Sequence, residues 1–279
     1  MLFEKIEFNS VRLADETESS QGIIIYKTKE DSTRNEYTGF KKKSSEWKKL
    51  LRGTNIGRYM IKWGGEYIKY GDWLWSQRNE KFFYNNKIIL QALRNKSLSR
   101  RLIATFDSEK YYNAHNLANI ISKHNSQYSL LYILGIFNSN LTNFWYKTHF
   151  PNVNINPNEF RQIPIPKIDF GGKSKSKEIE RLVNDYLTNQ KSKNDILTHM
   201  KLEDLRFFHD LIVKLVERIL EMNSHENKDE SLISKIDDLI NYCIYETKSI
   251  SPQEIEIIEK GLNKNISKII LRNPKSESD

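Results

Sequence analysis

The chain has 279 residues, with 44 Lys and Arg, 36 Asp and Glu, a formal net charge of +8 and 38% hydrophobic residues. This composition excludes wholesale disorder, and the single cysteine, Cys243, excludes a disulfide framework and a cysteine-based zinc cluster. No apolar run approaches the roughly 20 residues of a membrane helix, and the first residues are too charged for a signal peptide, so we expect a cytoplasmic protein without a membrane span.

Charge is distributed unevenly along the chain. Residues 1–170 carry 26 basic and 16 acidic side chains, whereas residues 171–279 carry 18 and 20. Residues 41–110 alone hold 17 basic and 6 acidic groups. This asymmetry indicates a polyanionic partner for the first part, although a Lys-rich surface that only aids solubility gives the same composition.

Strand patterns lie in the first part of the chain. The apolar run at residues 22–27 predicts a buried strand, and residues 87–91 and 102–106 predict two more. Residues 59–70 predict a hairpin, because Gly64-Gly65 at its centre can supply the positive φ of a tight turn.

Four side chains in this region have expected positions. Lys62 and Lys87 lie within strand patterns and are expected to point outward beside apolar neighbours. Trp73 and Trp75 are expected in the core, because aromatic side chains mostly contribute buried area.

A helix is expected to begin at Ser129, because apolar residues recur at three- and four-residue steps through Trp145. The alternating prolines of Ile163-Pro164-Ile165-Pro166 hold the chain extended. Residues 171–177, rich in Gly, Lys and Ser, are typical of a solvated linker. We therefore place a domain boundary after residue 170.

The pattern beyond this boundary is helical. Residues 179–187, 205–219 and 232–243 each have one apolar face. Ser251-Pro252-Gln253-Glu254 is a capping box with proline at the first helical position. The expected fold class is α+β, with a mixed, strand-rich domain over residues 1–170 followed by a helical docking or spacer module over residues 171–279.

Common catalytic signatures do not occur in the sequence. There is no glycine-rich phosphate loop and no Gly-x-Ser-x-Gly elbow. Neither Asn-Pro pair is followed by the proline and aromatic residue of an amino-methyltransferase loop, and the six histidines never pair at metal-ligand spacing. No catalytic residue and no metal site is therefore expected.

One pattern resembles a nuclease, because metal-dependent nucleases often hold magnesium with an Asp and a later Glu-x-Lys. Glu46-Trp47-Lys48 follows Asp31, and two further Glu-x-Lys triplets occur. With this content of Glu and Lys, chance alone gives about two or three triplets. A stand-alone magnesium-dependent DNA endonuclease is therefore kept only as the alternative function.

Five phrases in the first part of the chain resemble, in the same order, the TaqI-like carboxy-terminal specificity domain. This is the target recognition domain of many adenine-N6 DNA methyltransferases and type IIG restriction-modification enzymes. The five phrases lie at residues 50–59, 82–89, 102–107, 132–139 and 163–166. Each phrase alone is weak, and their shared order makes the resemblance specific.

The resemblance implies a protein that reads a short double-stranded DNA sequence for a catalytic partner. Asn55 stands where the family more often has Asp. The methyltransferase domain that normally precedes this module is missing, which implies a separate specificity subunit, a gene fragment or a truncated chain. We therefore expect no enzyme activity, no S-adenosylmethionine site and no other cofactor.

Basic and amide side chains are the candidate DNA contacts. Lysines and arginines that can neutralise phosphates are Lys41, Lys42, Lys43, Lys48, Lys49, Arg52 and Arg58. Arginines that could contact guanine through two hydrogen bonds are Arg78, Arg94, Arg100 and Arg101. Amides that could read adenine are Gln77, Asn113 and Asn116.

Three functions are compatible with the sequence. The first is sequence-specific recognition of double-stranded DNA, with the helical module docking a methyltransferase or nuclease part, or a second copy of the chain. The second is the endonuclease described above. The third is a helical scaffold whose basic surface is incidental, which would bind DNA weakly and without sequence preference.

Overall fold

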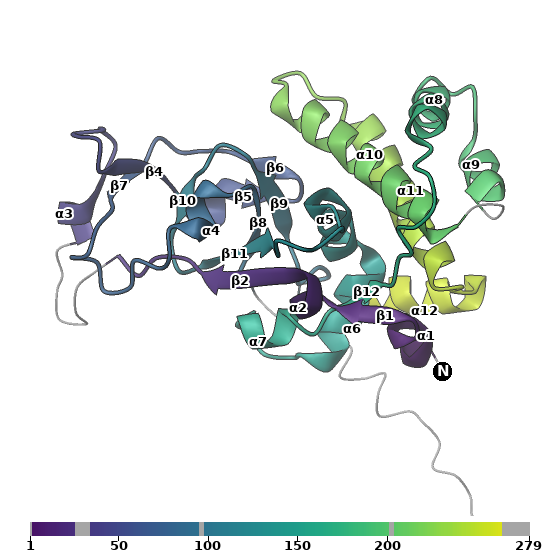
Figure 1. The fold of residues 1–279 in the computed structure, drawn as a ribbon, viewed down its shortest axis with the longest axis horizontal. Helices are drawn as coiled ribbons and strands as arrows, with labels where there is room; N and C mark the ends of the chain where they lie inside the picture. Colours follow the sequence, from purple (N-terminus) through teal and green to yellow (C-terminus); the bar gives the residue numbers. More distant parts are fainter. Residues whose placement is uncertain (1, 26–33, 95–97, 201–203, 264–279) are drawn as a thin grey trace, which may run out of the picture.

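The computed structural model describes residues 2–25, 34–94, 98–200 and 204–263. Its main sheet is antiparallel, with the strand order β2-β11-β8-β9 (Figure 1). The strands are β2 (Thr17–Gln21), β8 (Lys87–Gln91), β9 (Ala104–Asp107) and β11 (Leu117–Ser122). Ile88 stands opposite Phe106 on one side and Ile120 on the other, so one face of the sheet presents an apolar row to the principal core.

A second sheet, β10-β4-β7-β3, forms the lobe at the left of Figure 1. Its strands are β3 (Thr38–Gly39), β4 (Trp47–Leu51), β7 (Tyr67–Lys69) and β10 (Tyr112–Asn113). Leu50 and Ile68 are fully buried and pack with Phe83 in a small core of their own. This lobe also contains α3 (Arg34–Tyr37), and α4 (Lys81–Tyr84) contributes Phe83 to its core. η1 (Gly53–Asn55) leads from β4 into β5 (Ile56–Gly57) and β6 (Met60–Ile61), which pair with each other and pack against β9 of the main sheet.

Two short helices follow the main sheet along the chain, and the first of them packs against β8 and β9. They are α5 (Leu130–Asn138) and α6 (Asn140–His149). Ser129 caps α5 by accepting a hydrogen bond from Leu131 N, and Ser139 caps α6 by accepting from Thr142 N. Ser139 has extended backbone angles (φ −71°, ψ 155°), so the chain turns there and the expected single helix becomes two.

The later helices lie on the side of α5 and α6 away from the sheet; the last three of them pack against α5 or α6, and the first two pack against those three (Figure 1). They are α8 (Ser176–Leu187), α9 (Lys193–Met200), α10 (Leu205–Ser224), α11 (Glu230–Thr247) and α12 (Pro252–Asn263). Gly135 allows α5 to approach α10 closely, because a Cβ there would lie 2.7 Å from Ile212 Cγ2. No helix of the described ranges is long and apolar enough to cross a membrane.

The N-terminal residues lie against the later helices. They form α1 (Leu2–Glu7), β1 (Ser10–Arg12) and α2 (Leu13–Glu16), and β1 pairs antiparallel with β12 (Pro164–Pro166), which follows α7 (Pro157–Phe160). Lys248 Nζ donates to Phe8 O at 2.8 Å, and Trp145 Nε1 donates to Glu7 Oε1 at 2.9 Å.

The α+β class is confirmed. The strand at residues 87–91 has the predicted bounds, the strand expected at 102–106 runs over residues 104–107, and the capping box at Ser251 is formed with Glu254. The principal core contains buried residues from both sides of residue 170. The hydrophobic core is thus continuous across the predicted boundary. The division into domains 1–170 and 171–279 stays a prediction.

The predicted hairpin at residues 59–70 is wrong. β6 pairs with β5, and β7 pairs with β4 and β3, so the two arms join different sheets. Gly65 does adopt a positive φ of 82°, but its turn connects these two sheets. Within the predicted strand at residues 22–27, Ile23 and Ile24 form only isolated bridges, and residues 26 and 27 lie outside the described ranges.

Candidate nucleic-acid interface

The second sheet has one apolar face and one face that carries lysines and aromatic rings. Because side chains alternate along a strand, Trp47 and Lys49 of β4 share a face with their partners Lys69 and Tyr67 of β7. The surface built around these four residues is called here the lysine–aromatic face, and its members are Lys43, Trp47, Lys49, Trp63, Tyr67, Lys69 and Tyr111.

Each lysine of this face lies over an aromatic ring. Lys49 Nζ is 5.2 Å from the ring centre of Trp63 and 5.4 Å from that of Tyr111. Lys43 Nζ is 4.9 Å from the ring of Trp47, and Lys69 Nζ is 4.4 Å from the ring of Trp73. Such contacts hold the ammonium groups in place without neutralising them, and Lys69 Nζ lies in addition 4.0 Å from the carboxylate of the exposed Glu46. The face therefore presents positioned positive charge to a polyanion.

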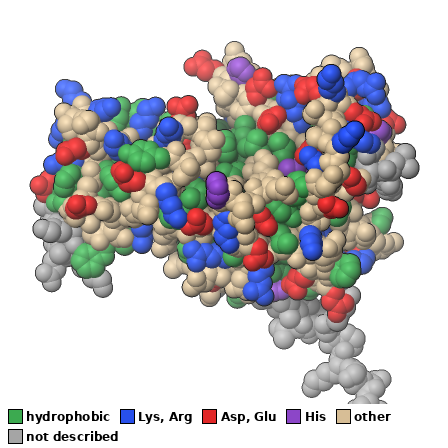
Figure 2. Space-filling view, viewed as in Figure 1, with side chains coloured by type: hydrophobic (Ala, Val, Ile, Leu, Met, Phe, Trp, Pro, Cys, Tyr) green, Lys and Arg blue, Asp and Glu red, His purple; other side chains and the backbone are tan. Residues whose placement is uncertain are grey.

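Lys41, Lys42 and Lys43 lie in the connection between β3 and β4, and all three are exposed. Figure 2 shows Lys and Arg side chains gathered along the upper edge of the lobe that contains the second sheet. The predicted phosphate-contacting lysines are therefore accessible on this lobe. Lys48 points to the opposite side of β4 from Lys49 and is half-buried.

Arg52 is engaged by a carboxylate. Its Nε and Nη2 donate to the two carboxylate oxygens of Glu66, each at 2.6 Å. The hydrogen bonds to Glu66 raise the pKa of Arg52 against the opposing effect of burial. A guanidinium held in this fork has less capacity for phosphate than a free one.

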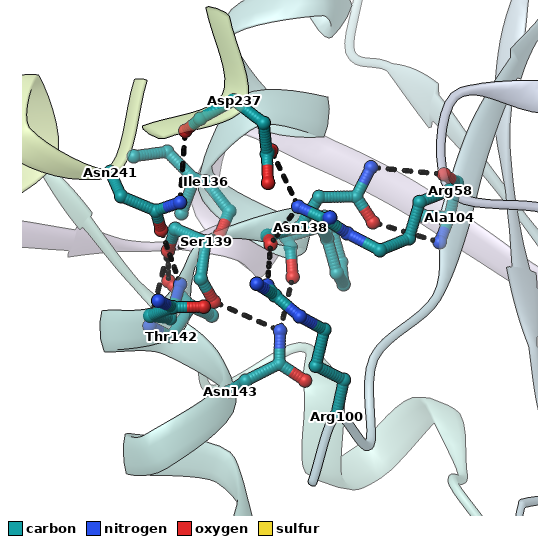
Figure 3. A network of polar contacts seen from close by, with 12 residues as sticks. Arg58, Arg100, Ala104, Ile136, Asn138, Ser139, Thr142, Asn143, Asp237 and Asn241 are labelled. Atoms are coloured by element: carbon teal, nitrogen blue, oxygen red, sulfur yellow. Dashed lines mark hydrogen bonds and ion pairs between the residues drawn. The ribbon is translucent and has the colours of Figure 1, made fainter. Parts of the chain in front are cut away.

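Arg58 and Arg100 converge on the carboxyl end of α5 (Figure 3). Arg58 Nη2 lies 2.9 Å from Asn138 O and 2.6 Å from Asp237 Oδ1, and Arg100 Nη1 lies 3.0 Å from the same Asn138 O. The last carbonyls of a helix lack helical partners and carry its negative dipole end, which suits two guanidinium groups. Burial is the largest effect on the pKa of Arg58 and lowers it, but the charges of Asp237 and Tyr59 and the hydrogen bonds to them together outweigh burial, so the pKa is raised.

The Asn138 side chain extends this cluster to the main sheet. Its amide donates to Ala104 O at 3.0 Å and accepts from Ala104 N at 3.1 Å, so it continues the edge of β9 (Figure 3). The structure thus brings two predicted DNA-contacting arginines together in a network that joins β9, α5 and α11.

Arg94 and Arg101 also make internal bonds. Arg101 is only 1% exposed, and its Nη2 donates to the carbonyls of Asn152 and Val153. Arg94 donates to Gln91 Oε1 at 2.6 Å and to Arg100 O at 3.2 Å. Burial lowers the pKa of both guanidinium groups.

Two of the predicted adenine readers, Asn113 and Asn116, lie where β10 of the second sheet leads into β11 of the main sheet. Asn113 is fully buried, and neither atom of its amide has a hydrogen-bond partner among the described residues. Asn116 packs against Gly53, where a Cβ would lie 2.9 Å from Asn116 Nδ2. Gln77 is half-buried, next to Arg78 in the connection between β7 and α4. The role of all these predicted contacts in binding DNA stays a prediction.

Two expectations about side-chain direction are wrong. Lys87 is fully buried and forms an ion pair with the equally buried Asp107, because the second sheet and its connections cover that face of β8. Trp75 is 60% exposed rather than in the core, whereas its neighbour Leu74 is 5% exposed. Trp73 packs against the small core and Lys62 is exposed, as expected.

The nuclease alternative depends on Asp31, Glu46 and Lys48. Glu46 is exposed, and its Oε2 lies 4.0 Å from Lys69 Nζ, while Asp31 lies outside the described residues. Within the described part of the chain, no group of three or more His, Cys, Asp or Glu side chains is placed to hold a metal ion.

The sequence patterns did not predict the grouping of the lysine–aromatic face. Trp63, Tyr67 and Lys69 were assigned to a local hairpin, whereas Tyr67 and Lys69 pair with β4, about 20 residues earlier in the chain. The matching alternation of Trp47-x-Lys49 and Tyr67-x-Lys69 was the available signal.

A strand-rich lobe with a basic, aromatic sheet face has the features of a DNA-recognition domain. Residues 48–165 match the TaqI-like C-terminal specificity domain, which confirms the family resemblance from β4 to β12. A specificity domain of this family indicates DNA sequence recognition in methyltransferase and restriction systems. A comparison with curated proteins gave no match.

Proposed function

We propose that this chain is the specificity module of a restriction-modification system and binds double-stranded DNA in a sequence-specific manner. The observation that carries the proposal is the lysine–aromatic face, because most of it lies within the matched residues 48–165. Its ammonium groups, with Lys41 and Lys42 beside them, would contact phosphates and set the register of the lobe on the duplex.

The helices α8–α12 lie beyond the matched residues. We propose that they dock the catalytic part, an adenine-N6 methyltransferase or a fused nuclease of type IIG, or a second copy of this chain. Their shared core with α5 supports a fixed geometry between reader and docking surface. In this proposal the chain itself performs no chemistry and binds no S-adenosylmethionine.

Selection from a pool of randomised duplexes tests the proposal with the full chain. We expect enrichment of one short sequence, and a dissociation constant for it that rises steeply with salt. Weak retention without any preferred sequence would favour the incidental basic surface instead. Magnesium-dependent cleavage of a supercoiled plasmid that is lost in Glu46→Ala would favour the endonuclease.

A further inference from the structure

The six arginines predicted to contact DNA differ in whether their guanidinium ends are already bound. Reading guanine requires the two terminal nitrogens, because they reach O6 and N7 together. In five of the arginines at least one terminal nitrogen is committed to a carboxylate, a carbonyl or an amide, namely Arg52, Arg58, Arg94, Arg100 and Arg101.

Arg78 is the exception among these six. It donates through Nε to Gly22 O at 3.1 Å, and its Nη1 and Nη2 have no partner among the described residues. The bond at Nε fixes the plane of the guanidinium and leaves its outer edge available. This is the arrangement that a rigid contact with two acceptors requires.

The backbone around Arg78 is held in place. Arg78 has a φ of 67°, a left-handed conformation that is costly for a side chain with a Cβ and needs support from its surroundings. Tyr70 donates its hydroxyl to Arg78 O at 3.0 Å. Ser76 is bridged to Ile24 by two backbone hydrogen bonds, of 3.0 and 3.4 Å. The segment Trp75–Asn79 is therefore anchored on both sides of Gln77.

The segment Trp75–Asn79 comes shortly after β7 in the chain, and β7 carries Tyr67 and Lys69 of the lysine–aromatic face. Trp73 Nε1 donates to Lys69 O at 3.0 Å, which attaches the connection to the end of β7. Leu74 then enters the small core while Trp75 turns outward, 60% exposed. One short segment thus carries both an exposed indole and a guanidinium whose Nη1 and Nη2 have no partner among the described residues.

We propose that the segment Trp75–Asn79 reads one guanine of the DNA target, with Arg78 Nη1 and Nη2 donating to O6 and N7 and Trp75 packing on the neighbouring base edge or sugar. The proposal rests on the proposed function and specifies the residue that discriminates one base pair. The apolar contact excludes water from the two hydrogen bonds, which increases their contribution to discrimination.

The experiment compares the full chain with Arg78→Ala, Arg78→Lys and Trp75→Ala on the sequence selected by the unaltered protein. One good contact of this kind contributes about 1–3 kcal/mol, so Arg78→Ala is expected to lose roughly 5- to 150-fold of the preference at one guanine position and little elsewhere. Arg78→Lys retains part of it, and Trp75→Ala weakens binding. Arg181→Ala, an exposed arginine on α8, is the matched control and is expected to bind as the unaltered chain does.

A change in the DNA keeps the test valid even where a variant folds poorly. Replacing each guanine of the selected sequence in turn by 7-deazaguanine removes N7 without altering the protein. One position is expected to weaken binding by the unaltered chain and to have no further effect on Arg78→Ala. If the unaltered chain selects no sequence, the proposed function itself fails. If it selects one and no guanine position depends on Arg78, only the assignment of this segment is overturned.

Discussion

Lys87 of β8 and Asp107 of β9 stand opposite each other in the main sheet and form an ion pair in which both side chains are fully buried. Asp107 also accepts hydrogen bonds from Glu109 N at 2.8 Å and Tyr111 N at 3.0 Å. One carboxylate thus fixes the lysine and the turn that leads to Tyr111. Since Tyr111 lies under Lys49, the pair supports the lysine–aromatic face from below.

Removing one partner of this pair is expected to destabilise the protein strongly. Lys87→Met leaves Asp107 buried without its counter-charge, which typically costs about 3–5 kcal/mol in the free energy of unfolding. Urea denaturation followed by circular dichroism measures this change. Lys167→Met, at an exposed lysine, is the control and is expected to stay within about 0.5 kcal/mol of the unaltered chain. A Lys87→Met variant as stable as that control would contradict the account.

The ion pair between Arg58 and Asp237 connects residues 179 positions apart in the sequence. Asp237→Asn is expected to reduce the free energy of unfolding by about 2 kcal/mol, because the half-buried guanidinium loses its charge partner. Asp238→Asn is a matched control, since Asp238 is the next residue on α11 and is exposed. In a double-mutant cycle, Arg58→Ala and Asp237→Asn should be non-additive, whereas additive losses would show that the two residues act independently.

The sequence was sufficient to predict the family and several of the periodic helices and strands. It was not sufficient to predict which partners individual charged side chains contact. The strand at Lys87 has the predicted bounds, but strand periodicity does not reveal that another sheet covers the face on which Lys87 lies. The turn at Gly65 was recognised, whereas the pairing of β7 with β4 depends on residues that lie outside any local window. Arg58 was assigned to phosphate because of its positive charge, and its partner Asp237 lies 179 positions away in the sequence, where no local pattern reveals it. Patterns of residue type thus predict local structure, and tertiary packing decides which charges remain free.

His209 of α10 is expected to make stability depend on pH. Its Nε2 accepts a hydrogen bond from Ser129 N at 3.1 Å, which requires that nitrogen to be unprotonated, while Nδ1 contacts Asp210 Oδ1 at 2.8 Å. Burial lowers the pKa of His209, an effect that Arg206 adds to and Asp210 opposes. The unfolded chain therefore binds the proton more readily, and stability falls as the pH drops below about 6.5.

Urea denaturation at pH 7.5 and pH 5.5 measures this dependence. We expect the free energy of unfolding to fall between these values by at most about 1.4 kcal/mol per pH unit for this one group. His209→Gln should reduce the difference, because glutamine does not titrate. An unchanged difference in that variant would assign the pH dependence to other groups.

Lys49 and Lys69 are expected to contribute to affinity without contributing to sequence choice. Each neutralised phosphate adds roughly 0.9 to the slope of the logarithm of the binding constant against the logarithm of salt concentration. The double variant Lys49→Ala, Lys69→Ala should therefore lower that slope by about two and weaken binding to selected and unrelated duplexes by the same factor. Lys167→Ala is the control for loss of a surface charge away from this face. If the double variant lost affinity only for the selected sequence, these lysines would contact base edges. The lysine–aromatic face, and not Arg78, would then discriminate between bases.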